Sequence, residues 1–254
     1  MTLQSFSDAS SLVGIGLQGV LAAVLVGRTA WRRYPLFTGY ALFGFVGAVT
    51  LYFLRSRVSN SFYFYGYWIE EAIAIVLGFG VVYEIFQHLF SAHKALLNLA
   101  RLIFRWTVVA LFCVAVSVVL VQAPVTSMLR NGVLIFEEAT RVVEVGLLMF
   151  LFAASAAFGL HWKQAEFGIA LGLGLFVAVE LAATTLRSQF AAPGQSGQST
   201  WNALNLVRIL AFNTSLLVWL GYLLAPERAT SQVEVPKRAQ LEQWNQAVTE
   251  LISR

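Results

Sequence analysis

The residues most able to do chemistry in this chain are acidic residues that interrupt long apolar segments. Glu70 and Glu71 are adjacent within YGYWIEEAIAIVLGFG, and Glu137, Glu138 and Glu144 follow in a second apolar segment. An ionised carboxylate is costly in apolar surroundings, so it must be paired, protonated or matched by a bound cation. These residue types therefore point to three chemistries: structural ion pairs, a pocket for a cationic ligand, or passage of protons or ions.

An arginine accompanies the second group of carboxylates at helical spacing. Arg141 comes four residues after Glu137 and three before Glu144, so the three side chains share one face of a helix. Glu138 is also within reach of that arginine. A second arginine, Arg208, lies in the last apolar segment and is the other cation available to the carboxylates.

Taken together, these groups are expected to form one charged layer in the outer half of a helical bundle. A helix rises by about 1.5 Å per residue, and the segments place their charges at similar depths. The predicted ligand-binding or ion-pair network consists of Glu70, Glu71, Glu137, Glu138, Arg141, Glu144, Glu180, Asn205 and Arg208. Glu84 and Glu166 fall toward the inner side, where they would serve as relay points if protons or ions cross the bundle.

No catalytic constellation accompanies these carboxylates. The run FEEATR is similar to the Glu-Glu-x-x-x-Arg signature of the glutamate-type intramembrane proteases, but its arginine comes one residue too early. All three histidines lie near the predicted inner face, and no lysine lies in the last span to form a retinal Schiff base. The sequence also lacks GxSxG, HExxH and Walker motifs. We therefore expect no enzyme activity, no cofactor and no metal site.

The composition places the chain in the membrane class. Of its 254 residues, 58% are hydrophobic and only 12% are charged, about half the charged share of a soluble domain. A membrane span needs about 20 mostly apolar residues. Seven segments meet this requirement: 9–27, 35–54, 62–87, 103–121, 132–158, 166–186 and 202–224. Because a helix satisfies its own backbone groups in lipid, we predict an all-α membrane protein with a bundle of seven transmembrane helices.

The distribution of basic residues predicts the orientation of this bundle. With the N-terminus outside, eleven Lys and Arg residues fall on the inner side and four, Arg55, Arg57, Arg130 and Arg187, on the outer side. The positive-inside rule therefore favours an external N-terminus, an internal C-terminus and a plasma (inner) membrane location. The first apolar run has no basic residues before it, so we expect a retained span and not a signal peptide. The lipid bilayer is the expected partner, and nucleic acid is not.

Small residues recur at the spacing that lets helices approach closely. Gly168 and Gly172 form a GxxxG pattern. The first two predicted helices carry further glycines: Gly14, Gly16, Gly19, Gly39, Gly44 and Gly47. We expect these glycines to pack against neighbouring helices.

The composition changes after the last span, which divides the chain into a transmembrane domain, 1–228, and a cytoplasmic segment, 229–254. In this segment Leu241, Trp244, Val248 and Leu251 recur at three- and four-residue steps, as expected for a short amphipathic helix. That helix would lie on the inner leaflet or the bundle, or would bind a cytoplasmic protein partner through residues 237–253.

Five segments carry a resemblance to a known group: YPLFTGYALFG at 34–44, YWIEEA at 67–72, YEIFQHLF at 83–90, NLVRILAFN at 205–213 and VWLGYLLAPE at 218–227. They resemble a group of uncharacterised bacterial seven-helix integral membrane proteins with no assigned activity. The resemblance implies the fold and an inner membrane location, and it transfers no functional residue.

These observations favour a sensory or regulatory membrane protein. Its carboxylate-rich pocket would bind a small cationic or polar ligand, and the tail would report to a cytoplasmic partner. Two alternatives remain open. One is a proton- or cation-coupled transporter or channel, and the other is a structural or assembly subunit in which the charges only lock the helices together.

Overall fold

The structure is a computed structural model that describes residues 3–54, 60–91, 125–157, 162–189 and 195–226, with residues 98, 102, 105–106, 109–110 and 113. These ranges contain helices and turns and no strand. Residues up to Leu224 form one compact unit. The predicted amphipathic helix at 237–253 and most of the predicted span 103–121 lie outside the described residues.

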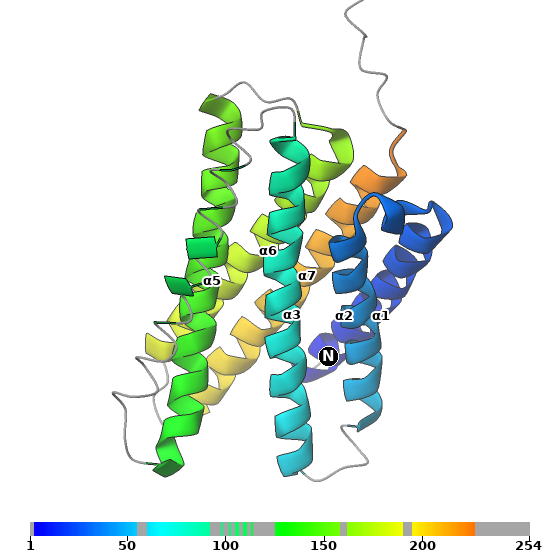
Figure 1. The fold of residues 1–254 in the computed structure, drawn as a ribbon. Helices are drawn as coiled ribbons and strands as arrows, with labels where there is room; N and C mark the ends of the chain where they lie inside the picture. The colour runs from blue at the N-terminus through cyan, green and yellow to red at the C-terminus, as the bar shows by residue number, and fades with distance from the viewer. Residues whose placement is uncertain are drawn as a thin grey trace, which may run out of the picture. The chain divides into compact units, whose positions relative to one another are not determined.

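The described ranges of this unit contain six long α-helices, which Figure 1 labels. They are α1 (Leu3–Gly27), α2 (Pro35–Leu54), α3 (Asn60–Leu89), α5 (Val125–Ala157), α6 (Gln164–Gln189) and α7 (Gln195–Leu224), with a short 3-10 helix η1 (Ala30–Arg32). Each of six predicted spans falls on one of these helices. Five of them, α1, α2, α5, α6 and α7, are long and apolar enough to cross a membrane, and α3 is not among the five. The described part of the chain is therefore that of a helical, multi-pass membrane protein.

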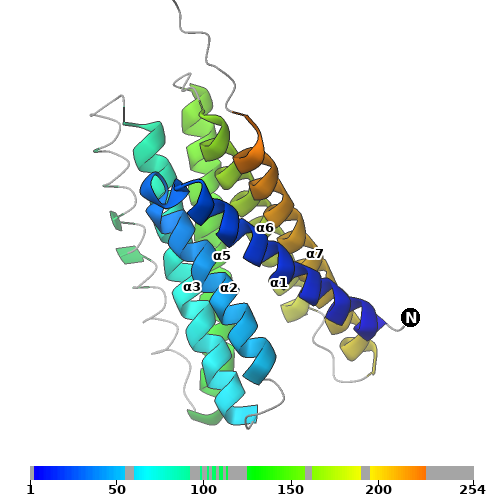
Figure 2. The same cartoon turned by 90° about the vertical axis from the view of Figure 1, so that its right-hand side faces the viewer.

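The helices form a closed ring. In chain order, α1 packs on α2, α2 on α3, α3 on α5, α5 on α6 and α6 on α7, and α7 then packs on α1 to complete the circuit. Figure 2 shows α1 lying at a slant beside both α2 and α7. Side chains on the inner face of each helix therefore point toward a shared interior.

The interior of the ring is mostly apolar but also holds buried charges, and many apolar side chains are exposed on its outer surface. Arg141, Glu144 and Glu180 are at most 6% exposed, whereas Val76 and Met149 are 70% and 68% exposed. A soluble protein keeps charges at its surface and rarely exposes contiguous apolar area. An apolar outer surface with charged side chains held in the interior is the combination expected when the surrounding solvent is lipid.

The α6–α7 contact depends on the two glycines of the GxxxG pattern. A Cβ atom built at Gly168 would overlap the side chain of Tyr222, and one at Gly172 would overlap the indole of Trp219. That indole N–H donates a hydrogen bond of 3.1 Å to the carbonyl oxygen of Ile169. The predicted packing role of these two glycines is confirmed.

The glycines of α1 and α2 differ in how closely other side chains approach them. A Cβ at Gly19 would lie 3.1 Å from the ring of Phe45, and one at Gly14 would lie 2.6 Å from Oδ1 of Asn213. Gly16 and Gly39 meet nothing within 4 Å among the described residues. The predicted close packing is therefore found at Gly14 and Gly19 and, within the described ranges, not at Gly16 and Gly39.

Gly172→Ala is expected to lower the melting temperature of the purified protein. The added methyl group must displace Trp219, which is only 1% exposed and whose indole N–H is hydrogen-bonded to Ile169. Overpacking of this kind costs about 1–3 kcal/mol. The matched control is Gly174→Ala on the same helix, where the nearest atom to the new Cβ is Leu148 Cδ1 at 3.9 Å. Equal melting temperatures for the two variants would contradict the role given to Gly172.

Candidate functional site

One group of charges ties α3 to α5. The guanidinium of Arg141 donates hydrogen bonds to Glu71 Oε1 at 2.5 Å and to Glu144 Oε2 at 3.0 Å. Glu71 belongs to α3, and Arg141 and Glu144 belong to α5. The three side chains are almost wholly removed from the surface, with side-chain exposures of 14%, 7% and 1% in the order Glu71, Arg141 and Glu144. The arginine therefore bridges one carboxylate on each of two helices, and its single positive charge offsets one of their two negative charges.

A second ion pair ties α6 to α7. Glu180 on α6 pairs with Arg208 on α7. The carboxylate is 1% exposed, and its Oε2 accepts no hydrogen bond from any residue that the structure describes. This oxygen of the buried carboxylate can therefore still accept a hydrogen bond.

The two ion pairs face a common interior. The Cζ atom of Arg141 lies 5.7 Å from the centre of the Phe176 ring on α6, which is within the range of a cation–π contact. Arg141 is also within electrostatic range of Glu180 and of Tyr40 on α2. The structure thus brings together predicted site residues from α3, α5, α6 and α7.

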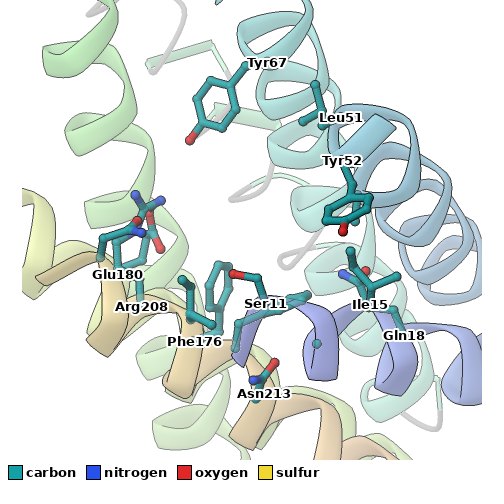
Figure 3. Close-up of a pocket in the computed structure, with 15 residues that line it drawn as sticks. Ser11, Ile15, Gln18, Leu51, Tyr52, Tyr67, Phe176, Glu180, Arg208 and Asn213 are labelled. Carbon is teal, nitrogen blue, oxygen red and sulfur yellow. Dashed lines mark ion pairs between the residues drawn. The ribbon is translucent and has the colours of Figure 1, made fainter. Parts of the chain in front are cut away.

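Two adjoining cavities occupy this interior, each with a volume of about 350 Å³. The first contains the Glu180–Arg208 pair together with Ser11, Asn205 and Asn213. Figure 3 shows this pair and Tyr67 of α3 around the same space.

The second cavity contains Glu70, Glu71 and Arg141, with Tyr40 and Trp219 also in its wall. Gln18, Tyr67, Phe176 and Phe212 line both cavities and so form the boundary between them. The interior is therefore one apolar-walled space with an ion pair on each side.

The two adjacent carboxylates of α3 have different surroundings. Glu71 is bound to Arg141, whereas Glu70 has no ion pair or hydrogen bond within the part of the chain that the structure describes. The carboxylate of Glu70 instead lies against Gly47 of α2, where a Cβ atom would be 2.6 Å from Oε1. Glu70 also lines the second cavity.

Glu84 holds the start of α2. Its Oε1 accepts the backbone N–H of Leu36 at 3.0 Å, and its Oε2 accepts that of Phe37 at 2.9 Å. The first N–H groups of a helix have no partner within the helix, and the positive end of the helix dipole favours a carboxylate there. Both oxygens of this predicted relay residue are thus engaged in capping a helix.

Glu166, the other predicted relay residue, lies in the first turn of α6. It is 2% exposed, and its Oε1 is 3.9 Å from Nζ of Lys163. This position is again the favourable one for an acidic side chain in a helix. Neither residue lines either of the two cavities.

Sequence reasoning missed several residues of the interior and could not place others. The side chains of Glu137 and Glu138 lie outside the described residues, although their backbone belongs to α5. Gln18 and Tyr40 were not predicted. A glutamine in the middle of an apolar span was a usable signal for Gln18, whereas nothing in the sequence distinguishes Tyr40 from an aromatic residue at the membrane interface.

Within the described ranges, no group of three His, Cys, Asp or Glu side chains is arranged to hold a metal ion. Comparisons with protein-family models, with curated proteins and with solved structures find no match to this chain. The function is therefore argued from the chemistry of the site itself.

Arg141→Met is expected to lower the free energy of unfolding strongly. It leaves Glu71 and Glu144 buried without their cation, and breaking a buried pair from one side costs about 3–5 kcal/mol. The measurement is thermal or denaturant unfolding in detergent. The triple variant R141M/E71Q/E144Q removes all three charges and should recover most of the loss. A triple variant no more stable than R141M would show that charge balance is not what this group contributes.

Glu84→Ala is expected to speed hydrogen exchange at the backbone amides of Leu36 and Phe37. Losing both acceptors at the start of α2 should cost about 1–2 kcal/mol. Exchange measured by mass spectrometry on peptides covering the start of α2 reports this directly. Glu166→Ala is the control, because it alters the start of α6 and should leave these two amides unchanged. Unaltered exchange in E84A would contradict the capping role.

Proposed function

We propose that this chain is a sensory or regulatory protein of the plasma (inner) membrane that binds a small cationic or polar ligand in its interior cavities. The observation that carries the proposal is a ligand-sized space bordered by more carboxylates than guanidiniums. Cavities that bind small molecules measure about 300–1,000 Å³ and combine apolar walls with a few polar groups. Each of the two cavities, at about 350 Å³, falls in this range.

The charge balance supports a cationic ligand over an anionic one. Among the residues that the structure describes, the four carboxylates Glu70, Glu71, Glu144 and Glu180 face two guanidiniums, those of Arg141 and Arg208. With all of them ionised, two negative charges lack a partner in surroundings that solvate charge poorly. A bound cation would remove part of this imbalance.

We propose the full architecture to be seven spans with the N-terminus outside and the cavities in the outer half. In Figure 1, α3 and α5 run in the same direction. Two helices that run in parallel need the chain between them to recross the bundle, which supports the predicted span at 103–121. The unequal distribution of Lys and Arg supports the orientation.

Helix α7 offers a route from the cavities to a cytoplasmic partner. Its residues Asn205, Arg208 and Phe212 lie in the cavity walls, and the helix ends at Leu224, directly before the tail. Arg28, in the turn after α1, donates hydrogen bonds to the carbonyl oxygens of Leu223 at 2.6 Å and Leu224 at 3.4 Å. A shift of α7 on ligand binding would therefore act on both the α1–α2 turn and the start of the tail.

Glu84 caps the start of α2, and this role favours ligand binding over ion passage as the function of the bundle. A relay carboxylate must exchange its proton or ion, and Glu84 can do so only by releasing the Leu36 and Phe37 amides. The transporter alternative would be supported if proteoliposomes containing the protein dissipated a pH or voltage gradient.

Thermal unfolding in the presence of matched small molecules tests the proposal. Benzylamine, benzyl alcohol and benzoate share a ring and differ in charge. We expect only the amine to raise the melting temperature, since a ligand at 100 times its dissociation constant stabilises the folded state by about 2.7 kcal/mol. The control is the double variant E70Q/E180Q, which removes two cavity carboxylates. Equal responses to all three compounds, or none across a wider panel of amines, would contradict the proposal.

A further inference from the structure

Glu70 differs from every other described carboxylate of the bundle interior. Glu71 and Glu144 share Arg141, Glu180 has Arg208, and Glu84 accepts two backbone amides. Glu70 alone among them borders a cavity without a positive partner in the part of the chain that the structure describes. Glu70 is partly buried, and an ionised carboxylate without compensation is unfavourable in such surroundings, so a cation from outside the chain would stabilise this position.

Gln18 provides a second, independent indication of a ligand. This residue of α1 is 8% exposed and lines both cavities. Its amide oxygen is buried and accepts no hydrogen bond from the described residues. Buried polar atoms are nearly always hydrogen-bonded, and leaving one unsatisfied costs free energy. The second cavity therefore presents two acceptors in need of a donor, one of them charged.

The walls of the cavity favour an organic cation over a bare inorganic ion. Tyr67, one turn before Glu70 on α3, lines the second cavity together with Phe176, Phe212 and Trp219. Aromatic faces attract ammonium groups and also bury apolar parts of a ligand. A volume of about 350 Å³ exceeds what a single metal ion fills.

One cationic side chain of the protein already binds to a carboxylate and an aromatic ring at the second cavity. The guanidinium of Arg141 lies between the carboxylate of Glu71 and the ring of Phe176, which is 5.7 Å from Cζ. One carboxylate of the adjacent pair is thus already satisfied by a cation held between an acid and an aromatic ring. The other carboxylate, with Tyr67 and Gln18 lining the same cavity, offers the same combination to a ligand.

We infer that Glu70 and Gln18 form the subsite for the ammonium group of a small primary amine whose apolar body lies among the aromatic side chains of the second cavity. The ammonium group donates hydrogen bonds to the carboxylate of Glu70 and to the amide oxygen of Gln18. Glu71 and Arg141 position helices and are not part of the subsite. This assignment rests on the proposed function and names its ligand class and its recognition residues.

The test uses 2-phenylethylamine as the probe, with its neutral analogue 2-phenylethanol, on the full-length protein in nanodiscs. Calorimetric titration should give saturable binding of the amine and at least tenfold weaker binding of the alcohol. Glu70→Gln keeps the volume and removes the charge, so it should weaken amine binding at least tenfold. Gln18→Leu should weaken it several-fold. Glu166→Gln, which neutralises a buried carboxylate outside both cavities, should bind the amine as the wild type does.

Gly47→Ala provides a second variant that leaves every charge in place. Its Cβ atom would push against the carboxylate of Glu70, so amine affinity should fall although the cavity composition is unchanged. This variant keeps the assignment testable if Glu70→Gln does not fold. If Glu70→Gln or Gly47→Ala folds and binds 2-phenylethylamine as tightly as the wild type, the role given to Glu70 is overturned.

The results of these experiments distinguish a failure of the Glu70 subsite from a failure of the proposed function. A wild-type protein that binds neither this amine nor any other compound of a cationic panel would contradict the proposed function itself. Amine binding that survives E70Q and disappears in E180Q would retain the function and move the ammonium subsite to the first cavity. Displacement of the amine by millimolar sodium or potassium would overturn the organic-cation assignment in favour of an inorganic ion.

Discussion

The structure depends on one constraint, which is that charges inside a lipid-facing bundle must find their partners on other helices. Arg141 meets this constraint most fully: it binds Glu71 of α3 and Glu144 of its own helix and contacts the Phe176 ring of α6. In hydrocarbon, apolar burial does not hold helices together, because lipid tails are as apolar as the side chains. Ion pairs and close packing at small residues have to do so. The Arg141 group and the Glu180–Arg208 pair therefore act as fixed points of the ring.

These fixed points also account for the cavities. The ion pairs connect α3 to α5 and α6 to α7, while the glycines at 168 and 172 bring α6 directly onto the bulky side chains of α7. The helix contact between α6 and α7 is the most extensive in the ring, whereas the one between α3 and α5 is among the smallest. Side chains such as Gln18 and Tyr67 line the remaining space between the helices. The arrangement that stabilises the ring thus leaves polar groups around an interior space.

Much of the fold could be predicted from the sequence, because the thickness of the bilayer fixes the length of an apolar span. The predicted bounds of α2, 35–54, agree with the structure, and α5 and α7 begin seven residues before their predicted starts because a helix continues beyond its apolar part. The different roles of Glu70 and Glu71 could not be predicted. Adjacent residues on a helix point about 100° apart, and only the neighbouring helices decide which of them meets an arginine.

The capping role of Glu84 was not predicted, although the residues before α2 carried a signal for it. Helix α2 begins at Pro35 after Tyr34, so no Ser, Thr, Asp or Asn precedes it to accept its first amides. A helix start without a local cap requires an acceptor from elsewhere, and a carboxylate within an apolar helix is a candidate for that role. Once capping and ion pairing are assigned, Glu70 is the interior carboxylate for which the described residues offer no partner. Since an ionised carboxylate without a partner is unfavourable in such surroundings, a cation bound at Glu70 would also stabilise the fold. Because this carboxylate lies against Gly47 of α2, ligand binding would be coupled to the packing of α2 against α3.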